Sequence, residues 1–198
     1  MARSARGGVA SATGAVLGSF LAVRTGAASH IDGPAHRLLT QRHGPLSDRI
    51  IGAFTDMGSV YALAGVAAAL AARGRRDAAT DLAVAGAVAW VAAQGTKPLL
   101  HRPRPYELAG TARVVAVPAG SSWPSGHAAL AAAMTDALWP RARPRTRLTL
   151  VLMTAAVGLS RCYVGVHHLT DIVAGVGVGV LSSRTGGWAR TRTAARRR

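Results

Sequence analysis

Apolar blocks separated by basic or proline-rich connectors are the feature that most limits how this chain can fold. Hydrophobic residues make up 49% of the 198 residues and charged residues only 16%, which is below the usual quarter. The formal net charge of +16 lies almost entirely between the apolar blocks. A nucleic-acid-binding protein would instead carry its arginines along one face, interleaved with aromatic residues, and aromatics are only 5% here. The pattern therefore favours a membrane protein without a nucleic-acid partner.

The apolar blocks cover residues 9–23, 50–72, 82–95, 127–140, 148–159 and 172–181. The second block is close to the ~20 residues that a membrane-spanning helix needs. The last three are short, so a soluble all-helical domain is the competing interpretation.

Charge placement decides between the two. If both termini are cytoplasmic, every basic connector between helices falls on the cytoplasmic side, as the positive-inside rule expects. The segments on that side are the first six residues, 73–76, 141–147 and the basic tail 184–198. We therefore predict an all-α integral membrane bundle of about six helices, formed by residues 1–198 as a single domain.

Several features of the blocks stay open at this level. Residues 1–28 form either a first membrane helix or a cleaved signal sequence, because a small-residue site follows Gly26. Asp56, near the start of the second block, is a candidate functional carboxylate, but water reaches that depth and we favour a structural role. The role of Asp136 in the fourth block is open. In the sixth block, close helix contact is expected from the glycines at 175, 177 and 179.

The proline-rich stretch 97–126 cannot form the interior of a membrane helix. It begins with Lys97, the only lysine of the chain, and Arg104-Pro105 follows after six intervening residues. Two cations on a proline-stiffened loop suit a dianionic phosphate. The alternative is that they anchor the loop to lipid headgroups.

Pro124-Ser125-Gly126-His127 directly precedes the fourth block. A helix start offers free N–H groups to a phosphate, and Gly126 lets a ligand approach the backbone. Ser125 can cap the helix or donate a hydrogen bond, and His127 can protonate a leaving oxygen. The alternative is a plain helix start with an incidental histidine.

The stretch 160–171 combines an arginine, a histidine and an aspartate. His167 and Asp171 are four residues apart and share a face on a helix, so the carboxylate can set the imidazole tautomer and leave the other nitrogen nucleophilic. Arg161 offers a planar fork for phosphate oxygens. His168 is a weaker candidate nucleophile, and Cys162 is interpreted as a small packed residue rather than a reactive thiol.

Together the three stretches resemble, in order and spacing, the signature of the type-2 phosphatidic acid phosphatase superfamily. The matching pattern is Lys97-x6-Arg104-Pro105, then Pro124-Ser125-Gly126-His127, then Ser160-Arg161-x5-His167-x3-Asp171. This family includes lipid phosphate phosphatases, bacterial acid phosphatases and vanadium haloperoxidases. The signature region is 97–171, with no departure at any signature position, and the six-block layout resembles the integral-membrane branch.

The resemblance implies the catalytic roles. His167 would attack phosphorus and form a phosphohistidine, and Asp171 would orient His167 and stabilise its charge. His127 would protonate the leaving group and then activate the hydrolytic water.

The resemblance also implies how the phosphate is held. The phosphate ligands would be Lys97, Arg104, Arg161, Ser125 and the N–H of Gly126. No cofactor and no metal are expected, because three fixed cations replace a metal ion, and the sequence lacks a cluster with metal-ligand spacing.

The predicted function is hydrolysis of a lipid phosphate or pyrophosphate at the outer face by a multi-pass cell-membrane protein. Candidate substrates are a polyprenyl pyrophosphate, phosphatidate and phosphatidylglycerol phosphate, and the predicted partners are this lipid and the bilayer. The alternatives are a non-catalytic phospholipid-binding membrane protein and a vanadate-dependent haloperoxidase, although the known haloperoxidases are large and soluble. The sequence leaves the lipid and the oligomeric state undetermined.

Overall fold

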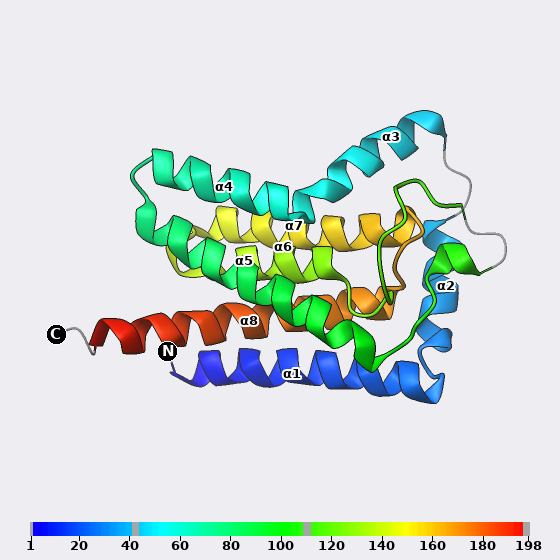
Figure 1. The fold of residues 1–198 in the computed structure, drawn as a ribbon, viewed down its shortest axis with the longest axis horizontal. Coiled ribbons are helices and arrows are strands. Elements are labelled where there is room, and N and C mark those ends of the chain that lie inside the picture. Colours follow the sequence, from blue (N-terminus) through cyan, green and yellow to red (C-terminus); the bar gives the residue numbers. More distant parts are fainter. Residues whose placement is uncertain (1, 41–43, 109–111, 196–198) are drawn as a thin grey trace.

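The computed structural model describes residues 2–40, 44–108 and 112–195, and in these residues it contains helices and no β-strand (Figure 1). The main helices of the bundle are α1 (Ala2–Thr25), α4 (Val60–Ala72), α5 (Arg76–Thr96), α6 (Gly126–Leu138), α7 (Pro144–Tyr163) and α8 (Leu169–Ala195). Shorter elements are α2 (Ser29–Leu39), α3 (Pro45–Phe54), η1 (Thr55–Gly58), η2 (Lys97–Leu99), η3 (Pro105–Glu107) and η4 (Trp139–Arg141). Helix α1 begins and α8 ends at the same end of the bundle (Figure 1).

The described residues contain eight α-helices rather than about six, for two reasons. First, α2 forms within 24–49, which the sequence pattern presents as a polar connector, because Asp32 is buried there by partners from distant parts of the chain. Second, the block 50–72 is broken, and α3 and α4 meet at a bend of 62°. Ser59 restarts the helix at this bend, since its hydroxyl caps α4 by accepting a hydrogen bond from Ala62 N at 3.2 Å.

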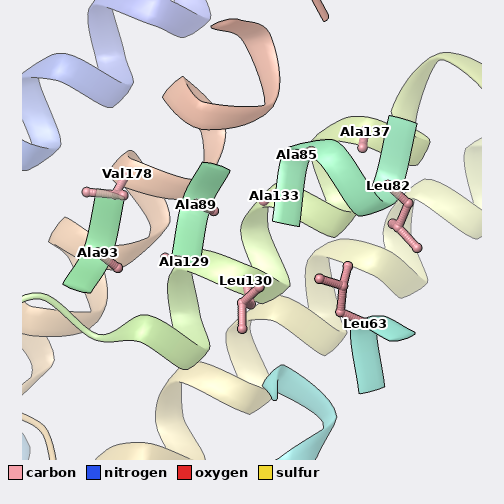
Figure 2. Packing of buried hydrophobic residues seen from close by; sticks show 10 residues of the cluster. All are labelled: Leu63, Leu82, Ala85, Ala89, Ala93, Ala129, Leu130, Ala133, Ala137 and Val178. Carbon is pink, nitrogen blue, oxygen red and sulfur yellow. The ribbon is translucent and has the colours of Figure 1, made fainter. Parts of the chain in front are cut away.

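Alanine side chains from α5 and α6 form most of the bundle core (Figure 2). Small residues let the helices approach closely, most clearly where α6 meets α8. A Cβ atom on Gly175 would lie 2.4 Å from Ser125 O, and one on Gly179 would lie 2.2 Å from Ala129 O. The expected close helix contact is confirmed at these two glycines. The core cluster consists of Leu63, Leu82, Ala85, Ala89, Ala93, Ala129, Leu130, Ala133, Ala137 and Val178.

Larger apolar side chains lie on the outside of the bundle. Leu17, Leu21, Val91 and Leu152 are each more than half exposed, whereas a soluble bundle would bury most such residues. Among the described residues, Gly7–Thr25 is by itself long and apolar enough to cross a membrane, and α3 with α4 passes the same test as a bent pair. The small core and apolar exterior favour a bundle surrounded by lipid over a soluble one.

Polar contacts join α8 to its neighbours at both ends. Near the termini, Arg184 Nη2 lies 3.1 Å from Asp136 Oδ1, so Asp136 forms an ion pair between α6 and α8. At the other end, Ser19 on α1 donates to Thr170 O at 2.8 Å and accepts a hydrogen bond from Trp123 Nε1 at 3.0 Å. Helix α1 is thereby connected to the loops that carry the predicted motifs.

Candidate functional site

The three predicted motifs meet at the end of the bundle opposite to the termini (Figure 1). Backbone hydrogen bonds of 3.0 Å join them, from Tyr106 N to Gly165 O and from Ser125 N to Asp171 O. The basic connectors 73–76 and 141–147 lie at the other end of the bundle (Figure 1). The fold thus separates the three motifs from the basic connectors along the bundle axis.

His167 lies in the loop between α7 and α8, just before the helix rather than on it. Its Nδ1 atom lies 3.7 Å from Asp171 Oδ2 and has no hydrogen-bond partner among the described residues. Burial lowers the pKa of His167 to about 4, against the opposing effect of the Asp171 carboxylate. His167 is therefore a buried, neutral imidazole at neutral pH, with one nitrogen turned to a carboxylate.

Both oxygens of the Asp171 carboxylate are engaged. Oδ1 accepts a hydrogen bond from Arg102 Nη1 at 2.5 Å, and Oδ2 accepts one from the backbone N–H of His168 at 2.8 Å. The ring of His168 turns away, and its Nε2 lies 3.2 Å from Pro103 O. Of the two adjacent histidines, His167 is thus the one whose ring faces the carboxylate.

His127 is in the first turn of α6, and its Nε2 lies 4.0 Å from Asp56 Oδ1. The structural role that we favoured for Asp56 stays a prediction: its side chain is 74% exposed, and its carboxylate borders the open space beside His127. The break between α3 and α4 causes this, since η1 turns Asp56 toward α6.

Lys97 and Arg104 both donate hydrogen bonds to backbone carbonyls of the loop between η3 and α6. Lys97 Nζ donates to Ser121 O at 2.6 Å, and Arg104 donates from three nitrogens to Ala119, Gly120 and Ser121 carbonyls and to Val166 O. Burial, followed by the charge of Arg104, lowers the pKa of Lys97 to about 8. Each cation has part of its hydrogen-bonding capacity used by the loop itself.

Arg161 is in the last turn of α7 and is 4% exposed. Its Nη1 donates to Thr55 Oγ1 at 3.1 Å, while its buried Nε has no partner among the described residues. Thr55 also accepts a hydrogen bond from Ser160 Oγ at 2.8 Å, so η1 positions the guanidinium. A buried cation with an unpaired donor is suited to bind an anion.

Ser125 and Gly126 form the start of α6. The Ser125 side chain is fully buried, and its oxygen caps the helix by accepting a hydrogen bond from Ala128 N at 3.4 Å. A Cβ atom on Gly126 would lie 3.4 Å from the Trp90 ring, so a small residue is accommodated there. The predicted helix start is confirmed, with Ser125 as its cap.

Two cavities flank the motifs. One, of about 720 Å³, is lined by His127, Arg161, Asp56, Asp48, Arg49 and residues 114–118. The other, of about 700 Å³, lies between the end of α1, α2 and residues 100–108, and its polar lining includes Asp32, Arg102 and His168. The first cavity is the one that reaches His127 and Arg161.

Sequence reasoning missed three residues of this region: Arg102, Asp32 and Thr55. Arg102 carried a signal, because it is a further cation between Lys97 and Arg104 in the same loop. Asp32 and Thr55 carried none, since neither belongs to a recognised motif and each gains its partners only from the fold. Among the described residues, no group of three or more histidine, cysteine or acidic side chains is arranged to hold a metal ion.

The sequence matches the PAP2 superfamily over residues 78–192. The structure resembles that of LpxE from Aquifex aeolicus, with a TM-score of 0.70 and 25% identity over 79% of this chain and 94% of that one. It also resembles a transmembrane PAP2-type phosphatidylglycerolphosphate phosphatase from Bacillus subtilis, with a TM-score of 0.79 and 20% identity over 93% of this chain and 96% of that one. Because the family match includes more than half of the chain and all three motifs, this chain belongs to the PAP2 superfamily, in the form of a membrane-embedded helical bundle.

Proposed function

We propose that this protein is a metal-independent phosphatase that hydrolyses a lipid phosphate or pyrophosphate through a phosphohistidine intermediate. The observation that carries the proposal is the convergence of His167, His127 and three cations, from separate parts of the chain, at one end of a bundle with an apolar outer surface. Membership of the PAP2 superfamily supports it.

The phosphate would bind between the start of α6 and the three cations. Arg161 would use its unpaired Nε, and Lys97 and Arg104 would use the donors that the loop leaves free. The N–H of Gly126 and the hydroxyl of Ser125 would complete the site at the positive end of the helix dipole. Fixed cations and amides at these positions stabilise the charge that spreads over the equatorial oxygens in the transition state.

The histidines would carry the covalent steps. Nε2 of neutral His167 attacks phosphorus, the bond from phosphorus to the leaving oxygen breaks, and His127, entering the step as the imidazolium ion beside Asp56, gives that oxygen a proton. Asp171 favours the tautomer with a proton on Nδ1 and stabilises the charge that develops on the ring. His127 then takes a proton from water as the water attacks the phosphohistidine, which releases phosphate and restores His167.

Two features support a membrane lipid as the substrate and the outer face as the place of reaction. The bundle exposes apolar side chains to lipid, so a substrate can approach within the bilayer and present its headgroup to the site. The basic connectors lie at the end opposite to the motifs (Figure 1), and the positive-inside rule assigns that end to the cytoplasm. The protein would then be a multi-pass membrane protein with an extracytoplasmic site.

Phosphate release by the purified protein, measured in detergent with EDTA over a panel of lipid phosphates, tests this proposal. The panel includes phosphatidylglycerol phosphate, phosphatidate and a polyprenyl pyrophosphate. We expect release from at least one of them without added metal. Tight lipid binding without turnover would instead indicate a phospholipid-binding protein, and halide oxidation that requires vanadate would indicate a haloperoxidase.

A further inference from the structure

A buried chain of three charges lies behind the proposed nucleophile. Arg102 donates from Nη1 to Asp171 Oδ1 and from Nη2 to Asp32 Oδ2, each at 2.5 Å. Asp171 is fully buried, Asp32 is 5% exposed and the Arg102 side chain is 11% exposed. One guanidinium therefore bridges two carboxylates, one of which faces His167.

Asp32 is held as firmly as the other two members. Its Oδ1 accepts a hydrogen bond from Thr170 N at 2.9 Å and its Oδ2 accepts one from Thr170 Oγ1 at 2.7 Å. Arg102 Nη1 also donates to Thr170 Oγ1 at 2.8 Å. Asp32 is on α2, outside the segment that matches the family, so a residue of the N-terminal region reaches the site through Arg102.

This geometry determines where the Asp171 carboxylate points. Arg102 holds Oδ1 and the His168 N–H holds Oδ2, which leaves Oδ2 directed at His167 Nδ1. Burying a charge without its partner costs free energy, so the charged group moves or changes its protonation state. Removing the guanidinium would therefore leave Asp171 and Asp32 as two buried carboxylates without their shared cation.

We propose that Arg102 and Asp32 are positioning residues for catalysis: Arg102 aims the Asp171 carboxylate at His167, and Asp32 on α2 holds Arg102 in place and balances its charge. The proposal rests on the proposed function, because it concerns how His167 is prepared for attack. Neither residue is required to touch the substrate.

The charge balance yields a signature that a purely structural role lacks. Arg102→Gln makes the surroundings of His167 more negative by one charge, which favours the protonated imidazole and moves the acid limb of kcat/KM to higher pH. Asp32→Asn makes them more positive and moves it to lower pH. The double variant restores the charge and returns the limb toward the wild-type position. At buried sites one charge shifts such a limb by about one pH unit.

The other charged or titratable groups near Arg102 and Asp32 are unchanged in all of these variants. Differences between the pH profiles of kcat/KM therefore report on the two substitutions. These charged or titratable groups are Lys97, Arg104, His127, Arg161, Cys162 and His168.

The experiment measures kcat and KM between pH 3 and 9 for the wild type, both single variants and the double variant, with one lipid phosphate that the wild type hydrolyses. Arg113→Gln is the matched control, because Arg113 is an exposed arginine of the same proline-rich stretch 97–126 and stacks on Tyr106. We expect Arg102→Gln to lower kcat by about 10- to 100-fold at neutral pH with a smaller change in KM. We expect the acid limb of kcat/KM to lie at the lowest pH for Asp32→Asn, at intermediate pH for the wild type and the double variant, and at the highest pH for Arg102→Gln.

The ordered limbs, with no shift for Arg113→Gln, support the proposal. Single variants whose limbs stay at the wild-type pH, or move in the same direction, overturn it while leaving the proposed function intact. An inactive wild type overturns the proposed function and this assignment with it. If Arg102→Gln does not fold, the comparison of Asp32→Asn with the double variant still decides, since coincident limbs in these two overturn the proposal.

Discussion

The backbone N–H of Ser125 donates a 3.0 Å hydrogen bond to the carbonyl oxygen of Asp171. This contact joins the start of α6, which carries His127, to the first turn of α8, which directly follows the loop that carries His167. Gly175 continues the same contact one turn along α8, where any larger residue would collide with the Ser125 carbonyl. The spacing of the proposed acid and nucleophile is therefore a property of the α6–α8 packing.

Replacing His167 with Ala removes the proposed phosphoryl acceptor. We expect phosphate release to fall by at least about 10⁴-fold, because the ring of His168, the weaker candidate nucleophile, is turned toward Pro103 O. His101→Ala is the control, since His101 is an exposed loop histidine. Turnover of the His167 variant at the rate of the control would contradict the assignment, provided that both variants elute as folded protein in detergent.

Replacing His127 with Ala removes the proposed general acid. We expect a loss of about 10²- to 10⁴-fold for an alkyl lipid phosphate and a much smaller loss for an aryl phosphate, whose leaving group needs no proton. The measurement compares kcat for the two substrates in the wild type and the variant. An equal loss on both would show that His127 acts in binding or folding instead.

The lowered pKa of Lys97 leads us to predict that activity falls at alkaline pH. Its pKa is lowered to about 8 by burial and by Arg104, so the ammonium is present below that pH and is lost as the pH rises through it. We expect KM to rise above about pH 8, while Lys97→Arg keeps its charge and moves this limit upward. Profiles of kcat/KM from pH 6.5 to 10 test this, and identical alkaline limbs in the two proteins would exclude Lys97 as the group responsible.

Membrane orientation can be tested with single cysteines, since the native Cys162 is buried. We expect Ala112→Cys, in the exposed loop near the motifs, to react with an impermeant maleimide in intact cells. Thr146→Cys, at an exposed position in the first turn of α7 at the other end, should react only after lysis. The reverse pattern would place the active site on the cytoplasmic side.

The motifs could be recognised from sequence because their chemistry is local. Spacing within each stretch brought together Lys97 with Arg104, Ser125 with His127, and His167 with Asp171, and the fold then joined the three stretches at one end. The start of α6 at Gly126 and the close packing at Gly175 and Gly179 were likewise predictable, because capping and small-residue contacts depend on neighbouring positions. The bend at Ser59 was not, since an apolar run looks the same whether straight or broken.

The order of residues alone determined the helical membrane architecture and led to the proposal of the two catalytic histidines, because apolar blocks, charged connectors and motif spacing are all encoded over short distances. Only the tertiary structure placed Asp56 beside His127, Thr55 against Arg161, and Asp32 against Arg102. Each of these pairs joins segments about 70 or more residues apart, with no periodic pattern that links them. The role of a buried or cavity-facing charge depends on the residues that pack against it. The surroundings of His167 and Asp171 therefore depend on the packing of α2, η1 and α8.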